Sequence, residues 1–464
     1  MAGLDPRHFS DFEAIVGARG LRQGNVTEML EPGIHPANLD ADVVLLPAST
    51  SEVAAIVGYC AQHQIPIVPH GGRTGLAGGA VSTPGQVVVQ TTRMDGIVEV
   101  DHLAGTAVVE AGATLGAIDE AVAEHGLSVG IDLAARDSAT IGGMVSTNAG
   151  GIEAFRHGVT RQRVLGLEVV LPDGRVLDDL KLVSKANEGY DIKQLVIGGE
   201  GTLGIVTRVA LALVPRPGAK ATALVSVASA DDAVRLFRRF RHHPGGTLLA
   251  SEIMWSGYAR AVAEANDLSG LLSFESDPGA LFDVIDVADD AAGSGQAFLE
   301  EVLAEAAEAE EIRDALIAKN DQERDKIWLI REDSWAIDRA KPDGFWYDVS
   351  VPHGALDRYA ADVFQRIAAL NAGFEVFVMG HLGDGNMHLT ITAGKPLPDH
   401  YDAVCDAVYA GLADIGGSFS AEHGIGLEKR AALVDHGSAV KLDMMRAVKA
   451  ALDPQNIMNP GKII

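Results

Sequence analysis

Two short segments of the chain combine histidines and a carboxylate in a pattern that suits a metal site. His381 and His388 flank LGDGNM, a turn that brings the ends of two strands together, so both imidazoles can meet one ion. Glu422 and His423 follow in SAEHGIG. Two histidines and one carboxylate make an open site that suits Zn, Mn or Fe and leaves positions for substrate oxygens. Taken singly, each histidine is more often a structural residue than a ligand.

Three glycine-rich segments indicate a second kind of chemistry. Residues 69–81 place five glycines directly after an apolar strand, so successive backbone N–H groups can form an anion-binding nest suited to a pyrophosphate. Residues 130–151 combine small residues, hydroxyls and paired glycines, which permits the backbone to approach a flat ring or a ribityl chain closely. Residues 187–207 form the third segment. Each segment alone is equally well explained as a structural loop.

A formal GxGxxG motif occurs at Gly199, Gly201 and Gly204, but its context is wrong for a dinucleotide-binding Rossmann unit. That motif must close a strand and open a helix, with an acidic residue about 20 positions further on. Here the apolar, β-rich run IVTRVALALV follows, and no such acidic residue is present. We therefore reject the Rossmann interpretation.

The predicted secondary structure that must position these residues divides into two regions. Residues 41–215 alternate short apolar strands, helices and glycine turns, and VPRPGAK at 214–220 marks a boundary. A second α+β region follows, with a strand at 222–229 and a long helix at 297–319 that carries an acidic, solvated face. Residues 374–392 predict a β-hairpin around Gly-Asp-Gly-Asn.

Composition limits the classes of function. The 464 residues carry 37 Lys and Arg against 64 Asp and Glu, a net charge of −27 that disfavours nucleic acid as a partner. The two cysteines exclude a disulfide framework. We see no cleavable signal and no apolar run of 18 residues, so we expect a soluble cytoplasmic protein without a transmembrane segment.

Taken together, the motifs resemble those of vanillyl-alcohol-oxidase-type flavoproteins. The similarity covers nearly the whole chain and is greatest to D-2-hydroxyglutarate dehydrogenases, D-lactate dehydrogenases and the glycolate oxidase flavin subunit; it rests on PHGGRTGLAGG, DLAARDSATIGGMVSTNAGG, LGLEVVLPDG and GYDIKQLVIGGEGTLGIVT. The resemblance implies an α+β fold in three parts. These are a two-part FAD-binding domain with an N-terminal arm at 1–218, an α+β cap domain with an antiparallel sheet and the metal site at 219–440, and a segment at 441–464 that returns to the FAD domain.

The resemblance also implies which residues hold FAD. One group cradles the pyrophosphate, a second contacts flavin, ribityl or pyrophosphate atoms, a third lies along the adenosine, and one residue returns near the flavin. In that order they are Gly71, Gly72, Arg73, Thr74 and Gly75; Ser138, Gly142, Gly143, Thr147, Ala149 and Gly150; Glu200, Gly201 and Ile205; and Asn459. His70 precedes the glycine pair rather than following it, so we interpret it as a non-ligand and expect FAD to be non-covalent.

For the reaction, the resemblance makes His381, His388 and Glu422 ligands of Zn or Mn, and His423 the base. A metal-chelated 2-hydroxy acid would lose its hydroxyl proton to His423 while C2 releases hydride to flavin N5. Arg331, in IWLIREDSW, matches the arginine that binds the substrate carboxylate. Its structural alternative is a surface ion pair with Glu332 or Asp333.

Three positions depart from the hydroxyglutarate pattern. Trp346 replaces a lysine, Trp335 replaces a small polar residue or proline, and Thr390 replaces an asparagine; Asn386 completes the expected substrate-binding residues. A pocket that loses a cation and gains two indoles favours an apolar substrate side chain, so we expect D-lactate or a longer monocarboxylic acid to be preferred over D-2-hydroxyglutarate. The alternative is that both tryptophans are core aromatics.

Other interpretations remain open at this stage. The three metal-site residues alone also suit a metallohydrolase with structural glycine loops, and the chain also suits a non-catalytic flavin subunit. D-2-hydroxyglutarate stays the alternative substrate. Related proteins pass electrons to electron-transfer flavoprotein, quinone or cytochrome, and no motif here selects among them. A homodimer is among the assembly states open to the chain.

Overall fold

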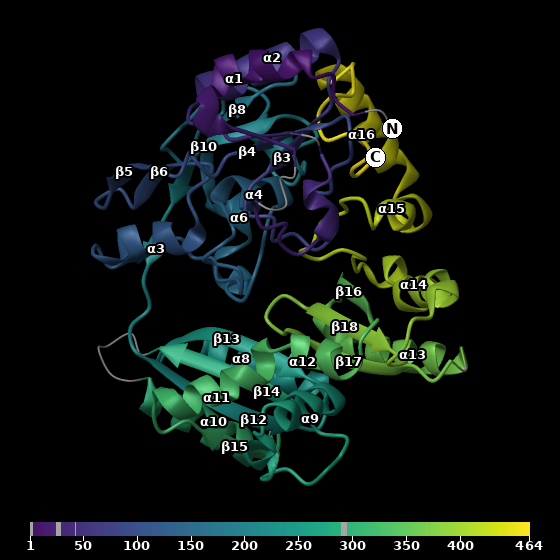
Figure 1. Cartoon of the computed structure of the whole chain (residues 1–464). Helices are drawn as coiled ribbons and strands as arrows, with labels where there is room; N and C mark the ends of the chain where they lie inside the picture. The colour runs from purple at the N-terminus through teal and green to yellow at the C-terminus, as the bar shows by residue number, and fades with distance from the viewer. Residues whose placement is uncertain (1–2, 25–28, 42, 289–294, 371) are drawn as a thin grey trace. The chain divides into compact units, whose positions relative to one another are not determined.

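A computed structural model describes residues 3–24, 29–41, 43–288, 295–370 and 372–464. The chain forms two compact units, each considered by itself (Figure 1). The first unit comprises Met1–Gly151, His157–Arg216 and Glu422–Ile464, and the second comprises Ile152–Arg156 and Pro217–Ala421. The chain thus leaves the first unit at 216 and returns at 422, whereas we placed these boundaries at 218 and 440.

The first unit begins with a four-stranded sheet ordered β1 (Leu21–Gln23), β2 (Val43–Leu45), β4 (Val87–Gln90) and β3 (Ile67–His70). Strands β2, β4 and β3 are parallel, and β1 is antiparallel to β2. The helices α1 (Arg7–Gly20) and α2 (Thr50–His63) supply apolar side chains to the same core as these strands. The strand β3 ends at His70, so the first glycine segment starts at the edge of this sheet.

The first unit also contains a five-stranded antiparallel sheet. Its order is β5 (Ile97–Asp101), β6 (Thr106–Glu110), β10 (Ile205–Ala212), β8 (Val164–Val170) and β9 (Val176–Asp179). The helices α3 (Leu115–Ala123) and α4 (Ile141–Thr147) share its core. The GxGxxG segment therefore opens the strand β10 rather than a helix, as we inferred from the sequence.

The second unit is built on a seven-stranded antiparallel sheet within the described residues. Its order is β15 (Asp314–Ile317), β12 (Lys220–Val227), β14 (Leu281–Ala288), β13 (Thr247–Met254), β17 (Glu375–His381), β18 (Asn386–Thr392) and β16 (Phe345–Ser350). The helices α9 (Ser256–Ala265), α11 (Asp321–Glu332) and α12 (Trp335–Ala340) pack on it and close a core. The predicted α+β class and the predicted hairpin, β17–β18, are both confirmed.

The helix expected at 297–319 is shorter than the sequence suggested. The helix α10 (Gln296–Glu308) ends where Glu310 adopts a left-handed backbone conformation with φ of 56°. The N–H of Glu311 then donates to the carbonyl of Ala306, a bond that closes a helix C-terminus. The chain continues into β15 because this strand finds a partner in β12, a long-range pairing that local periodicity does not reveal.

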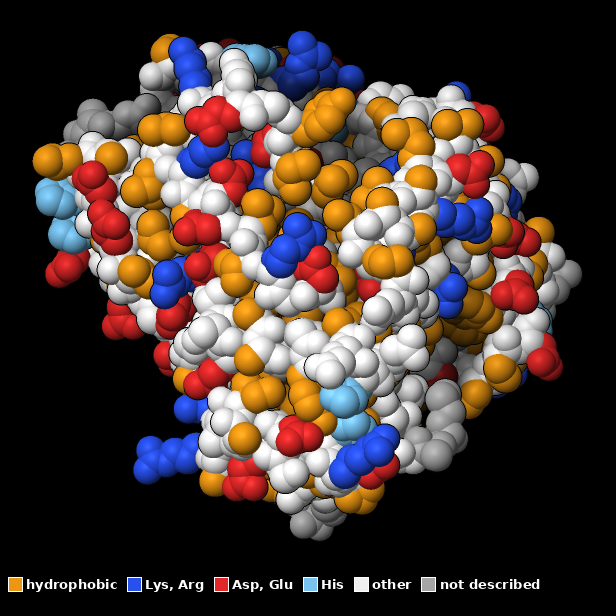
Figure 2. Space-filling view, turned by 90° about the horizontal axis from the view of Figure 1, so that it is seen from above, with side chains coloured by type: hydrophobic (Ala, Val, Ile, Leu, Met, Phe, Trp, Pro, Cys, Tyr) orange, Lys and Arg blue, Asp and Glu red, His pale blue; other side chains and the backbone are white. Residues whose placement is uncertain are grey.

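The surface is mixed in charge on the face shown in Figure 2, where acidic side chains are scattered among basic and hydrophobic ones rather than gathered in one patch.

Within the part of the chain that the structure describes, every helix is too short or too polar to cross a bilayer.

The C-terminal segment is attached to the first unit by a buried carboxylate. Asp453 follows α16 (Ala439–Leu452) and accepts hydrogen bonds from the backbone N–H groups of Ile457 and Met458, at 3.1 and 2.9 Å. Lys449 Nζ lies 2.6 Å from the same carboxylate. Met458 in turn pairs with Ile67 on β3. The tail therefore docks beside the strand that carries the first glycine segment.

We predict that Asp453→Ala lowers the free energy of unfolding by about 3 kcal/mol, because it leaves the buried N–H groups of Ile457 and Met458 without their acceptor and removes the counter-charge of the half-buried Lys449 ammonium. The control is Asp443→Ala on α16, whose exposed carboxylate forms a surface ion pair with Arg446 that is worth about 0.5 kcal/mol or less. Urea unfolding followed by circular dichroism measures both. Equal effects of the two substitutions would contradict the role given to Asp453.

Candidate active site

A cavity of about 330 Å³ lies in the first unit, within the size range of small-molecule sites. All three glycine-rich segments contribute to its wall, as do Glu422 and His423. Of the residues expected to hold FAD, those that line it are Gly71, Gly72, Arg73, Thr74, Gly75, Gly142, Gly143, Thr147, Ala149, Gly150, Glu200, Gly201 and Ile205.

Two of the glycines are required by close packing of one loop on another. A Cβ on Gly72 would lie 1.8 Å from the carbonyl oxygen of Ser138, and one on Gly71 would lie 2.2 Å from Thr140 Oγ1. No other residue type fits these positions without moving the second segment. The glycines therefore bring the first two segments into direct contact and leave backbone exposed to the cavity.

Ser138 and Asn459 support the wall from behind. Ser138 presents its carbonyl to Gly72 and does not line the cavity. The side-chain amide of Asn459 donates to the carbonyls of Gly79 and Glu200, at 3.0 and 2.8 Å. Asn459 thus joins the first and third glycine segments and holds these loops together, rather than lining the cavity.

Glu200 links the third segment to the chain that follows His423. Its carboxylate accepts hydrogen bonds from the backbone N–H groups of Ile425 and Gly426, at 2.7 and 2.8 Å. Burial raises the pKa of Glu200, and the two amide bonds oppose that rise. The carboxylate that we placed along the adenosine is therefore already engaged in holding the loop that carries His423.

His70 also lines the cavity, as a neutral side chain. It is buried, and its Nε2 lies 2.8 Å from the carbonyl oxygen of Ala80, so Nε2–H is the donor. Burial lowers the pKa of His70 to about 3, with the charge of Arg73 adding to the effect. Arg73 itself donates to Gln90 at 2.7 Å.

The two residues after the return to the first unit lie on the cavity wall. Glu422 Oε1 accepts a hydrogen bond from the backbone N–H of Gly151 at 2.6 Å, at the end of the second glycine segment. His423 also lines the cavity, which places an imidazole beside the expected flavin position. An imidazole there is suited to accept a proton at neutral pH.

The two other expected ligands lie together in the second unit. His381 ends β17, and His388 is the third residue of β18, across a turn closed by hydrogen bonds from the N–H of Gly385 to the carbonyls of His381 and Leu382. The ring centroids of His381 and His388 are 5.3 Å apart, with the rings nearly perpendicular. The hairpin therefore brings both imidazoles together, as the spacing predicted.

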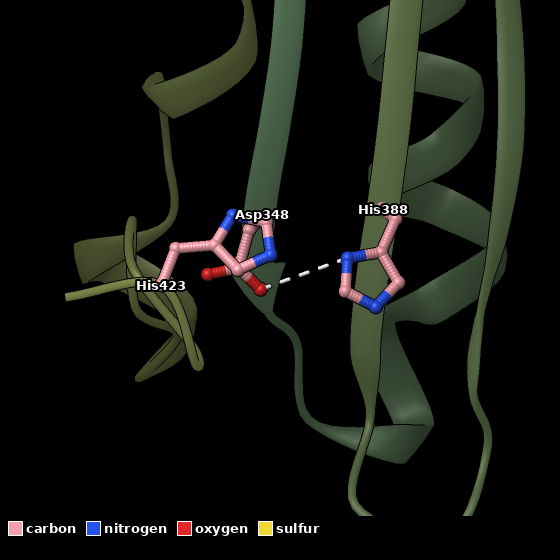
Figure 3. Close-up of side chains that lie close together, drawn as sticks. All are labelled: Asp348, His388 and His423. Carbon is pink, nitrogen blue, oxygen red and sulfur yellow. Dashed lines mark ion pairs between the residues drawn. The ribbon is translucent and has the colours of Figure 1, made fainter. Parts of the chain in front are cut away.

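Each of these histidines has a buried carboxylate beside its Nδ1. Glu252 lies 2.8 Å from Nδ1 of His381, and Asp348 lies 3.8 Å from Nδ1 of His388; Figure 3 shows the second pair, which joins β16 and β18. The carboxylate of Asp348 also accepts hydrogen bonds from the side-chain amide of Asn386, at 2.9 Å, and from the backbone N–H of Ala421, at 3.0 Å. A carboxylate at Nδ1 directs the lone pair of Nε2 toward a metal, an arrangement common in zinc proteins.

Arg331 is not the surface ion pair that we kept as its alternative. It is buried near the end of α11, and its guanidinium lies 2.5 Å from Glu252. Asp333 instead pairs with Arg339. Sequence reasoning missed Glu252; the only local signal is an acidic residue inside the apolar strand β13.

The two tryptophans are not core aromatics. Trp335 and Trp346 are 49% and 40% exposed, and their ring centroids are 5.4 Å apart. Trp346 is opposite Thr390 in the pairing of β16 with β18. Because side chains two apart on a strand share a face, Trp346 and Thr390 continue the face that carries Asp348 and His388.

Comparison with known proteins identifies the fold and the family. Residues 216–463 match the C-terminal domain of FAD-linked oxidases, and residues 41–179 match an FAD-binding domain. The chain belongs to the FAD-linked oxidase family. It is therefore a flavoprotein with a site for FAD, and a metallohydrolase whose glycine loops are only structural does not account for it.

Two relatives show how far the similarity extends. The D-2-hydroxyglutarate dehydrogenase of Bos taurus mitochondria is 34% identical over 446 residues, covering 93% of this chain and 80% of that protein. The D-2-hydroxyglutarate dehydrogenase of Xanthomonas citri pv. viticola is 35% identical over 435 residues, covering 90% and 88%.

Solved structures share the fold at low sequence identity. The 4-ethylphenol oxidase of Gulosibacter chungangensis has a TM-score of 0.74 at 20% identity, and p-cresol methylhydroxylase has 0.75 at 16%; each match covers 99% of this chain and 98% of the other. The fold is thus the vanillyl-alcohol-oxidase type expected from the sequence.

We predict that Gly72→Ala reduces FAD content at least about tenfold, because its Cβ forces the first two glycine segments apart. The control is Gly58→Ala on α2, where a Cβ meets no atom within 4 Å. Flavin absorbance per mole of purified protein measures the effect in both variants. Full flavin content in Gly72→Ala would contradict the packing role given to this glycine.

Proposed function

We propose that the chain is an FAD- and divalent-metal-dependent dehydrogenase that oxidises a D-2-hydroxy acid to the 2-oxo acid. The observation that carries the proposal is the cavity of the FAD-binding unit, whose wall combines the glycine segments with Glu422 and His423. The names of the relatives, D-2-hydroxyglutarate dehydrogenases, support the same class of reaction. Bound FAD supplies the hydride acceptor.

The chain supplies a base and an anchor for the substrate. His423 accepts the hydroxyl proton at an imidazole nitrogen as C2 is oxidised. Arg331 binds the carboxylate of the substrate through its planar guanidinium, whose Nε is buried and has no hydrogen-bond partner among the described residues. A buried donor without a partner is rare, and a carboxylate ligand would satisfy it.

His381, His388 and Glu422 would hold a divalent cation, Zn²⁺ or Mn²⁺. The fit rests on the donor set, two imidazoles and a carboxylate, and on the buried carboxylates beside their Nδ1 atoms, Glu252 in hydrogen-bond contact with His381 and Asp348 at 3.8 Å from His388. A cation there supplies Lewis acidity that makes the hydroxyl of a 2-hydroxy acid more acidic.

The side chain of the substrate would lie against Trp335 and Trp346. Two exposed indoles on the face that carries His388 and Thr390 offer an apolar surface. The two cations that lie between Trp335 and Trp346 in the sequence are already engaged, Arg339 with Asp333 and Lys341 with Glu375. Among the described residues we find no cation dedicated to a second carboxylate on this face, so we propose a monocarboxylic substrate such as D-lactate or a longer homologue. D-2-hydroxyglutarate, which the relatives' names favour, is the alternative.

Electrons must leave the reduced flavin for an acceptor. We propose a protein or small-molecule carrier of the kind that related enzymes use, an electron-transfer flavoprotein, a quinone or a cytochrome.

Anaerobic bleaching tests the reaction. We expect a D-2-hydroxy acid to bleach the flavin absorbance near ~450 nm, and a chelator to prevent bleaching while leaving the protein yellow, since the cation acts on the substrate and not on FAD binding. Added Zn²⁺ or Mn²⁺ should restore bleaching. If the chelated protein bleaches at the full rate, the metal has no role; if no D-2-hydroxy acid bleaches the protein, the chain is a non-catalytic flavin subunit.

Steady-state kinetics test the substrate side chain. We expect kcat/KM for D-lactate or a longer monocarboxylic acid to exceed that for D-2-hydroxyglutarate by about tenfold or more, because the second carboxylate lacks a cation. Trp346→Lys should move the ratio toward the dicarboxylate by about tenfold. Trp346→Leu, which removes the indole without adding charge, is the control. A wild-type preference for D-2-hydroxyglutarate would establish the alternative substrate.

A further inference from the structure

Three polar side chains of the second unit form a buried cluster, and Glu252 stands at its centre. Glu252 is 1% exposed, and both of its carboxylate oxygens lie 2.8 Å from Nδ1 of His381. One of them also lies 2.5 Å from Nη2 of Arg331. The side chains come from β13, β17 and α11, three elements that are distant in sequence.

The register of the sheet accounts for the first contact. Glu252 on β13 is directly opposite His381 on β17, so the two side chains share a face and lie within reach of each other. The second contact depends on the end of α11, where the hydroxyl of Tyr258 donates to the backbone carbonyl of Arg331 at 2.9 Å. Both partners of Glu252 are therefore held by backbone structure, not only by the carboxylate.

The hydrogen-bond chemistry assigns the tautomer of His381. Nδ1 of His381 also lies 3.4 Å from Nη2 of Arg331, which can only donate. The much shorter contact to the carboxylate shows that Nδ1 carries the proton and donates to Glu252. The lone pair of His381 then resides on Nε2, the nitrogen that a metal requires.

The same carboxylate orients Arg331. Glu252 engages Nη2, which fixes the plane of the guanidinium and neutralises its charge in the buried state. Nε of Arg331 remains buried without a hydrogen-bond partner among the described residues. The carboxylate of Glu252 thus determines which nitrogen of His381 is free to bind a metal. It also determines which N–H groups of Arg331 remain for a substrate.

We infer that Glu252 is a positioning residue that couples the metal ligand His381 to the substrate anchor Arg331. This inference rests on the proposed function. It makes Glu252 necessary for two separable properties, metal affinity through His381 and substrate KM through Arg331, although Glu252 itself contacts neither the metal nor the substrate.

The test compares Glu252→Gln and Glu252→Asp in the full-length, FAD-loaded protein. The glutamine keeps the size of the side chain but loses its charge and turns an amide toward one partner, so we expect the dissociation constant for Zn²⁺ or Mn²⁺ to rise at least about tenfold. We expect KM for the 2-hydroxy acid to rise by a similar factor at saturating metal, with flavin content unchanged. The aspartate keeps the charge and should recover part of both losses.

Asp283→Asn provides a control for the acid-to-amide replacement of a buried side chain in the same sheet. Asp283 is also fully buried, and it accepts from Ser251 on β13 at 2.9 Å. It is paired with Ile253 in the sheet register, so it faces away from Glu252. Burial raises the pKa of Asp283 far above its usual range, which makes the asparagine a nearly neutral replacement. We expect wild-type metal affinity and KM in this variant.

The possible results separate the two ideas. Wild-type metal affinity and KM in Glu252→Gln would overturn the inference while leaving the proposed function intact. Equal losses in Asp283→Asn would show a general effect of replacing a buried acidic side chain in this sheet and would also overturn it. A wild-type protein that binds no metal and bleaches with no D-2-hydroxy acid would overturn the proposed function first. If Glu252→Gln does not fold, Glu252→Asp decides: an unchanged metal affinity and KM overturn the inference, and a partial loss of both supports it.

Discussion

A carboxylate buried in a protein must be matched by donors, and this requirement organises the functional part of the molecule. Four such carboxylates bind donors that lie far away in the sequence or that directly follow a helix. They are Glu200, Glu252, Asp348 and Asp453. Burying any of them without its partners would cost several kcal/mol, so each one holds its partners in a defined place. The loops and strand ends that bear chemistry are therefore held as firmly as the core.

The segment between residues 421 and 426 shows the consequence most directly. In the second unit, the N–H of Ala421 is bonded to Asp348. In the first unit, the N–H groups of Ile425 and Gly426 are bonded to Glu200. Glu422 and His423 occupy the short stretch between these two anchors. Within the first unit, the backbone that follows the proposed base is thus held by charge-assisted hydrogen bonds to Glu200.

The acidity of the chain has a different meaning for a substrate that is itself an anion. A net charge of −27 does not attract a 2-hydroxy acid, so the attraction must be local. In the proposed function Arg331 supplies it, yet Glu252 forms an ion pair with this arginine in the buried state. Net positive charge for the substrate then depends on the proposed cation. Within the proposed function, the cation and the arginine would therefore act together on the substrate.

Local sequence determined the features that depend on neighbours along the chain. The turn between His381 and His388, the strand after Gly204 and the three glycine segments follow from spacing and backbone preference, and the structure and the family match agree with them. Tertiary structure decided what depends on partners distant in sequence. It ended α10 at Glu308 because β15 pairs with β12, and it placed Glu252 opposite His381 through the order of strands in the sheet. The burial of Arg331 and the exposure of the tryptophans were decided in the same way, since a sequence shows which residue stands at a position but not which surface covers it.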